Sequence, residues 1–504
     1  MRKLFTLFLL SVVLSGYAQR NHTDLSGLLN IPGTLKKSYE SHPAGTEFDL
    51  IKVIKLQRNS VDPTKTGVII MLNINHQHVA LPASKADILD LQATTREDFW
   101  QSVFLYENMY AHYDNKGYRN DIRQDLTEES LEYLGTLSGL FYEDAHVQDY
   151  VHRLFMNAKP LHINNQRPEV LSVRLLESPS PDAYMLPNGT LLISTGLLSV
   201  LDSEEELTAV IATEVAHYFL DHQVINVIKT ESRARRAEFW SGMLEIVAAG
   251  FDEYFIHKNE YYVLGTTYLG ADIIASVINA HTNSRLGMTY TQKQESRADK
   301  IACDYLVFQG IDPAALTSAL IKIRNYYEEA RDYYTLSRYG IYAGMDERIE
   351  RLPEPKKFQS RSYQKTVCGV TTFNALLHQA GNQYEQSIAF LRKNIDLKLT
   401  TDEDYTLLAK AHMQLYDSTE ANLETLDLIA RAKEMARYPN PNAYKQEILL
   451  LLRLNRQAKA ADALVEYYME LLSSQYNAGN IDDATWMSSE MNWANKLLQR
   501  IELF

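Results

Sequence analysis

The sequence predicts a mainly α-helical protein with a small β-sheet, an α+β fold. Short runs rich in Val, Ile and Leu, bounded by turn residues, lie before residue 80, and helical periodicity dominates the chain from residue 126 onward. Hydrophobic residues make up 45% of the chain and charged residues 23%, which is ordinary for globular proteins. Because 504 residues exceed what one core usually holds, we expect two or three domains.

The strands are expected in an N-terminal region, residues 19–120. Residues 48–56 and 67–74 are apolar runs, and the turn-forming residues 59–63 separate them, so a β-hairpin or part of a small sheet is predicted. His76 and His78 alternate like a pair of metal ligands on one strand face. No third ligand lies nearby, which favours a strand end at the surface.

The central region, residues 121–352, is predicted to be mostly helical. An apolar i, i+3 pattern runs through Leu131, Leu134, Leu137, Leu140 and Phe141, and a second helix follows through residue 154. Short strands are expected at 171–176 and 189–194, and one long helix at 204–228. Ser203 is placed to cap that helix, with Glu206 completing a capping box. The apolar stretches 240–251 and 262–278 fall short of the roughly 20 residues of a membrane span.

A linker is predicted at residues 353–369, where Pro, Lys and other polar residues are frequent. Residues 370–504 read as almost continuous helix. Tyr405 and Tyr444 lie 39 residues apart within equivalent helices. This separation is near the period of helix-turn-helix repeats, so we expect a tetratricopeptide-like helical region.

Residues 1–18 have the pattern of a secretory signal peptide. Arg2 and Lys3 precede an apolar run, and small residues end at Ala18. The run is too short to anchor the chain across a bilayer. We therefore expect a secreted or periplasmic protein without a stable transmembrane segment.

The charge and the cysteines bound the partners and the cross-links. The formal net charge of −14 argues against nucleic acid, which requires a basic face. Cys303 and Cys368 are the only cysteines. In an exported protein they can form one disulfide, and two buried free thiols are the alternative.

The long helix contains the one sequence that suggests chemistry, Thr213-Glu214-Val215-Ala216-His217. A zincin helix carries His-Glu-x-x-His, in which two imidazoles on one face bind zinc and the Glu polarises a water. Thr213 stands at the position of the first His. By itself Glu-x-x-His is common by chance, so its context decides.

That context is specific. Asp182-Ala183-Tyr184 and residues 189–198 lie upstream, and Glu295-Ser296-Arg297-Ala298-Asp299 lies downstream. Together with the helix, these segments resemble metallopeptidase family forty-eight. Its BepA-like periplasmic members join a zincin-like peptidase domain to tetratricopeptide repeats. The resemblance covers residues 125–352 well, the repeat region weakly and residues 19–120 not at all.

The resemblance implies roles for individual residues. His217 and Glu295 correspond to zinc ligands, Glu214 to the catalytic general base, and Asp299 to a residue that orients a ligating histidine. His222 fits a family pattern as a packing residue. An edge strand that would hold extended substrate by β-addition corresponds to Gly189, Thr190, Leu191, Leu192, Ile193 and Ser194.

Two departures from the family pattern weaken the expected zinc site. Thr213 offers only a neutral hydroxyl, a poor donor for zinc, so two ligands remain where catalysis needs three. Family members also carry Thr-His-Pro before an Arg-Ile pair. Here Arg348-Ile349 is present, but residues 341–343 read Ile-Tyr-Ala, and Tyr342 stands at the second lost histidine.

Four functions remain open from the sequence. The first is a pseudo-peptidase that acts as a chaperone, adaptor or decoy on unfolded or extended polypeptide and envelope proteins, with weak or absent zinc. The second is an active zinc-dependent metalloendopeptidase with an atypical metal site. The third is a helical-repeat scaffold for protein–protein interaction. The fourth is a folded relic with packing value only.

Overall fold

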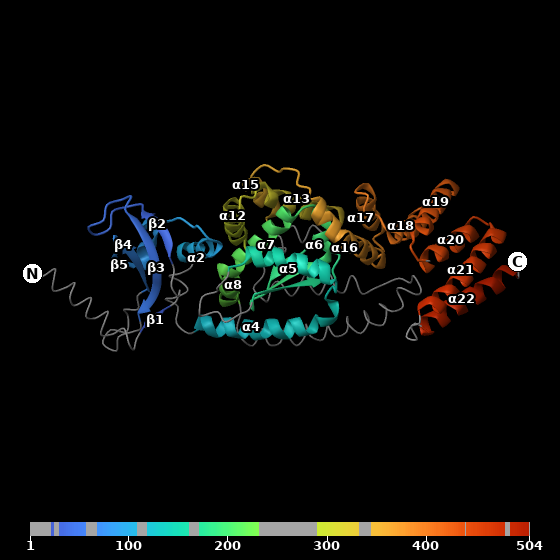
Figure 1. Cartoon of the computed structure of the whole chain (residues 1–504), viewed down its shortest axis with the longest axis horizontal. Helices are drawn as coiled ribbons and strands as arrows, with labels where there is room; N and C mark the ends of the chain where they lie inside the picture. The colour runs from blue at the N-terminus through green and yellow to red at the C-terminus, as the bar shows by residue number, and fades with distance from the viewer. Residues whose placement is uncertain are drawn as a thin grey trace, which may run out of the picture.

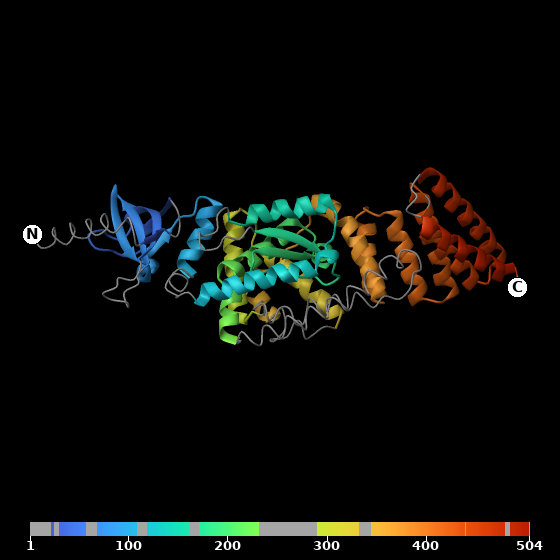
Figure 2. The ribbon, with the colours of Figure 1, turned by 90° about the horizontal axis from the view of Figure 1, so that it is seen from below.

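A computed structural model describes residues 22–24, 30–56, 68–107, 118–160, 171–230, 290–331, 344–438, 440–478 and 484–502. The molecule is elongated, with an N-terminal sheet, a central domain and a C-terminal helical region in a row (Figure 1). The same order is seen after a quarter turn about the long axis (Figure 2). The fold is mainly helical with small sheets, so the predicted fold class is confirmed.

The N-terminal sheet is antiparallel. Its main path runs β5-β4-β3-β2-β6, and β1 pairs with one end of the long β3. The predicted hairpin strands are adjacent: β3 pairs with β4 from Asp49↔Asn73 to Lys55↔Val68. The strands are β1 His22–Asp24, β2 Ile31–Leu35, β3 Glu47–Leu56, β4 Val68–Ile74, β5 Gln77–Pro82 and β6 Leu89–Leu91, with the 3-10 helix η1 Ala83–Ile88 between the last two. His76 and His78 are exposed at the β4–β5 turn, as a strand end at the surface should be.

Helix α2 (Arg96–Glu107) joins this sheet to the central domain through aromatic packing. Trp100 is fully buried, and its ring stacks on Tyr305 at 5.4 Å between centroids. The indole Nε1 donates to the carbonyl of Ala158 at 2.9 Å. Phe99 packs on the same Tyr305, so one core runs from the sheet into the central domain.

The central domain packs helices around a three-stranded sheet of order β7-β9-β8. β7 runs parallel to β9, and β8 runs antiparallel to it. The first part of this domain contains α4 Tyr118–Thr136, η2 Ser138–Leu140, α5 Ala145–Ala158, β7 Ser172–Leu176, β8 Ala183–Met185, β9 Thr190–Ser194 and α6 Thr195–Val200. The rest contains α7 Glu204–Phe219, α8 His222–Thr230, α12 Gln292–Phe308, α13 Ala314–Glu329 and α15 Met345–Arg351.

Three local predictions in this domain were wrong. The helix expected across residues 204–228 is two helices, because Asp221 adopts a left-handed φ of 60° between α7 and α8. Ser203 caps α7 as predicted. The capping box is not formed, because the Glu206 carboxylate accepts from the backbone amide of Asp202 instead of that of Ser203. The helix expected to continue to residue 141 ends at Thr136, and the short 3-10 helix η2 follows; Leu131, within α4, is 58% exposed.

The C-terminal region is a series of helical hairpins. The helices are α16 Arg361–Ala380, α17 Tyr384–Asp396, α18 Asp402–Leu415, α19 Thr419–Met435, α20 Pro441–Arg453, α21 Gln457–Ala478 and α22 Ala484–Glu502. The predicted linker at 353–369 is too long, since α16 begins at Arg361 and its polar residues form an exposed helical face. Tyr363 and Val367 of α16 are buried in the central core.

The two cysteines are free, part-buried thiols in the structure, which is the second of the two alternatives left open from the sequence. Cys303 lies on α12 and Cys368 on α16, where its thiol donates to the carbonyl of Lys365 at 3.3 Å. Burial raises the pKa of Cys303 to about 12, which keeps it protonated. The predicted signal peptide, the two apolar stretches 240–251 and 262–278, and Tyr342 lie outside the described residues. Within the described part, no helix has the length and apolar character needed to cross a membrane.

Candidate functional site

Helix α7 crosses the centre of the domain and carries the motif on its C-terminal half. Ser203 accepts from the Glu206 amide at 3.2 Å, and three glutamates occupy the first turn, where the helix dipole favours negative charge. Most of its remaining residues are buried, because the helix contacts α5, α12, α13 and strand β8. The motif residues are therefore held by core packing.

His217 is fully buried and is neutral at physiological pH. Burial, aided by the nearby Arg348, lowers its pKa to about 3. Its Nδ1 lies 3.0 Å from Nδ1 of His222, and its ring stacks on Tyr290 with centroids 3.7 Å apart. The other nitrogen, Nε2, lies 3.3 Å from Glu295 Oε2 but has no hydrogen bond among the described residues. A buried nitrogen of this kind is unusual in native proteins and marks a candidate site.

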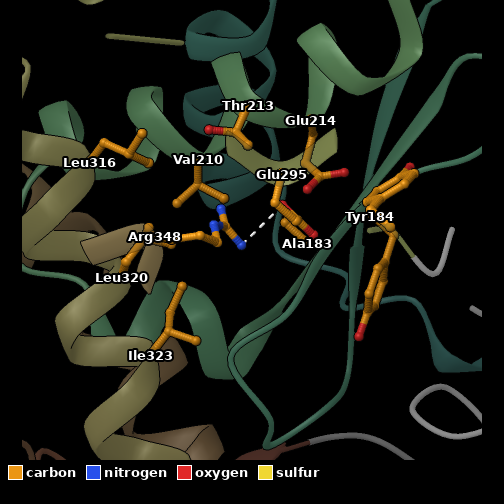
Figure 3. A pocket seen from close by; sticks show the side chains of 11 residues that line it. Ala183, Tyr184, Val210, Thr213, Glu214, Glu295, Leu316, Leu320, Ile323 and Arg348 are labelled. Atoms are coloured by element: carbon orange, nitrogen blue, oxygen red, sulfur yellow. Dashed lines mark ion pairs between the residues drawn. The ribbon is translucent and has the colours of Figure 1, made fainter. Parts of the chain in front are cut away.

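Glu295 and Asp299 lie one turn apart on α12, and both face Arg348 of α15. The guanidinium donates two hydrogen bonds to Asp299, from Nε to Oδ2 at 2.8 Å and from Nη2 to Oδ1 at 2.7 Å. Its Nη1 lies 3.0 Å from Glu295 Oε2, an ion pair drawn in Figure 3. All three side chains are buried. Asp299 thus binds an arginine, whereas the resemblance assigned it to a histidine.

Glu214 contacts the sheet. Its Oε2 accepts from the amide of Met185 in β8 at 3.1 Å. Burial and the neighbouring Glu295 raise the pKa of Glu214 to about 8, so the carboxyl group is largely protonated at neutral pH. A group with this pKa can take up or release a proton near pH 7, which suits acid–base work.

Thr213 is bonded to its own helix. Its Oγ1 donates to the carbonyl of Ala209 at 3.1 Å, the usual back-bond of a helical threonine. The side chain is buried beside Glu214 at the top of the pocket in Figure 3. The hydroxyl proton of Thr213 is therefore used in the bond to the Ala209 carbonyl.

These residues surround a pocket with one polar and one apolar side. Glu214, Glu295 and Arg348 form the polar side, while α13 contributes an apolar wall (Figure 3). The pocket measures about 540 Å³, including the solvent at its mouth. Its other lining residues are Ala183, Tyr184, Val210, Thr213, Tyr290, Leu316, Leu320 and Ile323. An apolar cleft with a few convergent polar groups is the usual form of a binding site.

The strand beside this pocket is β8, which corrects the sequence prediction. Residues Gly189, Thr190, Leu191, Leu192, Ile193 and Ser194 were expected at the sheet edge, but β9, which spans Thr190–Ser194, is the central strand of three. Both sides of its backbone are already paired, so no chain can add there. The pocket-facing edge is β8, Ala183–Met185. The sequence pattern singled out Asp182-Ala183-Tyr184 without an edge role, because strand order is a non-local property.

Comparison with known families agrees with this geometry. Residues 142–378 match the model of peptidase family M48. The chain therefore carries a peptidase family M48 domain. The match extends through α16, whose Tyr363 and Val367 belong to the central core. No curated protein matches the chain.

M48 peptidases are generally zinc-dependent, and a catalytic zinc requires three protein donors at one point. His217 Nε2 and Glu295 Oε2 are 3.3 Å apart, close to the roughly 3.4 Å between two ligands of one tetrahedral zinc. Thr213 and Glu214 are bonded elsewhere, and Asp299 binds Arg348. Among the described residues no three His, Cys, Asp or Glu side chains form a metal-binding group. Two donors do not fit a catalytic zinc, which needs three from the protein.

Sequence reasoning missed two contributors to the site and gave a third, His222, only a packing role through the resemblance. The continuous helix expected over 204–228 would turn His222 away from His217, but the left-handed turn at Asp221 brings the two rings together. Gln223 and Tyr290 were not singled out. The side-chain amide Nε2 of Gln223 donates to the backbone carbonyl of Met185 at 2.5 Å, and the ring of Tyr290 stacks on that of His217. The left-handed conformation of Asp221 could not be predicted from the sequence, because a non-glycine residue in that region has no reliable sequence signature.

Proposed function

We propose that the M48 domain of this protein is a pseudo-peptidase, which binds extended polypeptide in its cleft without zinc-dependent cleavage. The observation that carries the proposal is the reduced donor set. His217 Nε2 and Glu295 Oε2 are oriented as two ligands, while the hydroxyl at Thr213 is bonded into the helix. The cleft around them is kept, with an apolar wall and an edge strand.

Polypeptide is the ligand class that this cleft suits best. The strand β8 lies at the sheet edge, and edge strands bind extended chains through main-chain hydrogen bonds. Leu316, Leu320 and Ile323 offer apolar contact for alternate side chains of such a segment. With a secretory signal predicted at residues 1–18, the proposed role is that of a chaperone or adaptor for unfolded chains in the cell envelope.

An active enzyme with an atypical metal site is the second candidate. His217 Nε2 favours it, because this atom has no hydrogen bond among the residues that the structure describes and lies at a ligand-like distance from Glu295. A third donor would then have to come from a side chain outside the present set. The two candidates predict opposite metal contents and opposite effects of Glu214→Gln.

The test uses the full-length protein purified from the envelope fraction of the cells that produce it. Labelled casein is incubated with it, and aggregation of an unfolded client is followed separately by light scattering. We expect no cleavage, with or without added zinc, and suppression of aggregation. Casein cleavage that Glu214→Gln abolishes would establish the active enzyme instead.

A further inference from the structure

Strand β8 offers few main-chain groups to an incoming chain. In its antiparallel pairing with β9, residues 182, 184 and 186 point their backbone groups toward β9, as the bonds from Ser194 to Asp182 and from Leu186 to Thr190 show. Ala183 and Met185 therefore point theirs outward, toward the pocket side. These two residues are the positions at which a polypeptide could pair.

Both outward groups of Met185 are already bonded. Its amide donates to Glu214 Oε2 of α7 at 3.1 Å, and its carbonyl accepts from Gln223 Nε2 of α8 at 2.5 Å. A polypeptide paired with β8 would offer a carbonyl to the Met185 amide and an amide to the Met185 carbonyl. The side chains of Glu214 and Gln223 take these two roles in the structure. We call this arrangement the Met185 clasp.

The helix break holds the clasp in place. Asp221, at the left-handed turn between α7 and α8, forms a buried ion pair with Arg123 of α4 at 2.5 Å. This turn directs Gln223 back toward the sheet, where only 2% of it is exposed. Side chains of two helices, α7 and α8, thus converge on the backbone of Met185. No hydrogen bond to the outward groups of Ala183 is present within the described residues.

We propose that the Met185 clasp closes the C-terminal end of edge strand β8, so that an extended polypeptide pairs through Ala183 until the clasp opens. The inference rests on the proposed polypeptide binding and assigns its control to Glu214 and Gln223. Proteins commonly block sheet edges against unwanted pairing, and here the block lies inside a binding cleft. Glu214 thereby acts as a gate.

The experiment measures closure and binding separately. Closure is read by hydrogen–deuterium exchange of peptides that cover residues 180–188. Glu214→Ala should raise exchange of the Met185 amide by about tenfold, since it loses its acceptor. Glu214→Gln should leave exchange near the wild-type rate, because the amide oxygen still accepts. Unchanged exchange in Glu214→Ala would overturn the proposal.

Binding is read by fluorescence anisotropy with labelled, reduced and carboxymethylated α-lactalbumin, a permanently unfolded chain. Glu214→Ala and Gln223→Ala should each tighten binding by about tenfold, as each frees one group of Met185. The matched control is Gln294→Ala, which removes the bond from Gln294 to Asn226 of α8 at 2.8 Å without touching β8. It should bind as the wild type does.

The outcomes separate this inference from the proposed function. Wild-type binding that neither clasp variant tightens would contradict the clasp and leave polypeptide binding intact. Faster exchange at residues 180–188, with no binding by any variant, would support the clasp and contradict the proposed function.

Discussion

The two ends of helix α7 both bury ionisable side chains, but only one end satisfies them. At the N-terminal end, Glu206 accepts from Lys322 at 2.7 and 2.9 Å and from Ser318 at 2.5 Å. At the C-terminal end, His217 Nε2 lies beside Glu295 and has no hydrogen bond within the described part of the chain. Buried charges with a structural role are expected to have all their hydrogen-bond and ion-pair partners. A buried ionisable group that lacks a partner is more typical of a functional site.

The satisfied end also joins two parts of the molecule. Asp202 pairs with Lys322 of α13 and with Lys393 of α17, which in turn donates to the carbonyls of Ser199 and Leu201 at 2.7 and 2.9 Å. Lys393 therefore ties the helical hairpins to the M48 domain. At the other end the charges face a pocket. The same helix therefore combines a rigid docking point at one end with a cleft open to a ligand at the other.

The largest effect is expected at the open end, from Arg348→Met. This change leaves Glu295 and Asp299 buried without their cation, and breaking such a pair costs up to about 5 kcal/mol. The free energy of unfolding, from urea denaturation, measures it. Arg351→Met is the matched control on the same helix. Arg351 donates an exposed hydrogen bond to Ser296, so its loss should cost under about 1 kcal/mol. Equal costs for the two variants would contradict the network described here.

Lys322→Met should cost somewhat less, about 3 kcal/mol, at the satisfied end. Glu206 loses its cation, but Asp202 keeps Lys393. Lys356→Met, which removes an exposed pair with Asp312, is the control and should change the unfolding free energy by under about 1 kcal/mol. A cost of Lys322→Met as small as that of the control would remove the distinction between the two ends.

His378 provides a buried imidazole away from the cleft. It stacks on Phe390, and burial lowers its pKa to about 4 from the usual 6.5. The unfolded chain therefore binds a proton between these values that the folded chain does not, so stability falls as pH drops from 6.5 to 4. The free energy of unfolding should lose up to about 3 kcal/mol over this window through His378. In His378→Gln this part of the loss should disappear, and parallel pH profiles of the two proteins would contradict the assignment.

The smallest effect is expected from Thr213→Val, within about 1 kcal/mol of the wild-type unfolding free energy. The valine fills the same volume, and only the back-bond to Ala209 is lost. Thermal unfolding of both proteins tests this expectation. A loss of several kcal/mol would mean that the hydroxyl has a role beyond its own helix.

Sequence patterns predicted the local features of this molecule and missed the long-range ones. The i, i+4 spacing of Glu295 and Asp299 placed both on one face of α12, and they do face one residue together. That this residue is Arg348 depends on how α15 packs on α12. Likewise the strand at residues 189–194 was found, but its central place in the sheet was not. The turn at Asp221 brings His222 and Gln223 into the site, and its side chain pairs with Arg123 of α4, a long-range contact that no local pattern predicts.

The most direct test of the account is the zinc content of the wild type and of Thr213→His, measured by mass spectrometry after dialysis against a weak chelator. Positions 213 and 217 lie one turn apart and about 40° around the helix, so a histidine at 213 faces the same point as His217. It would complete three donors with Glu295. We predict well under one zinc per wild-type chain and about one in the variant. Tight zinc at about one per wild-type chain would contradict the pseudo-peptidase account.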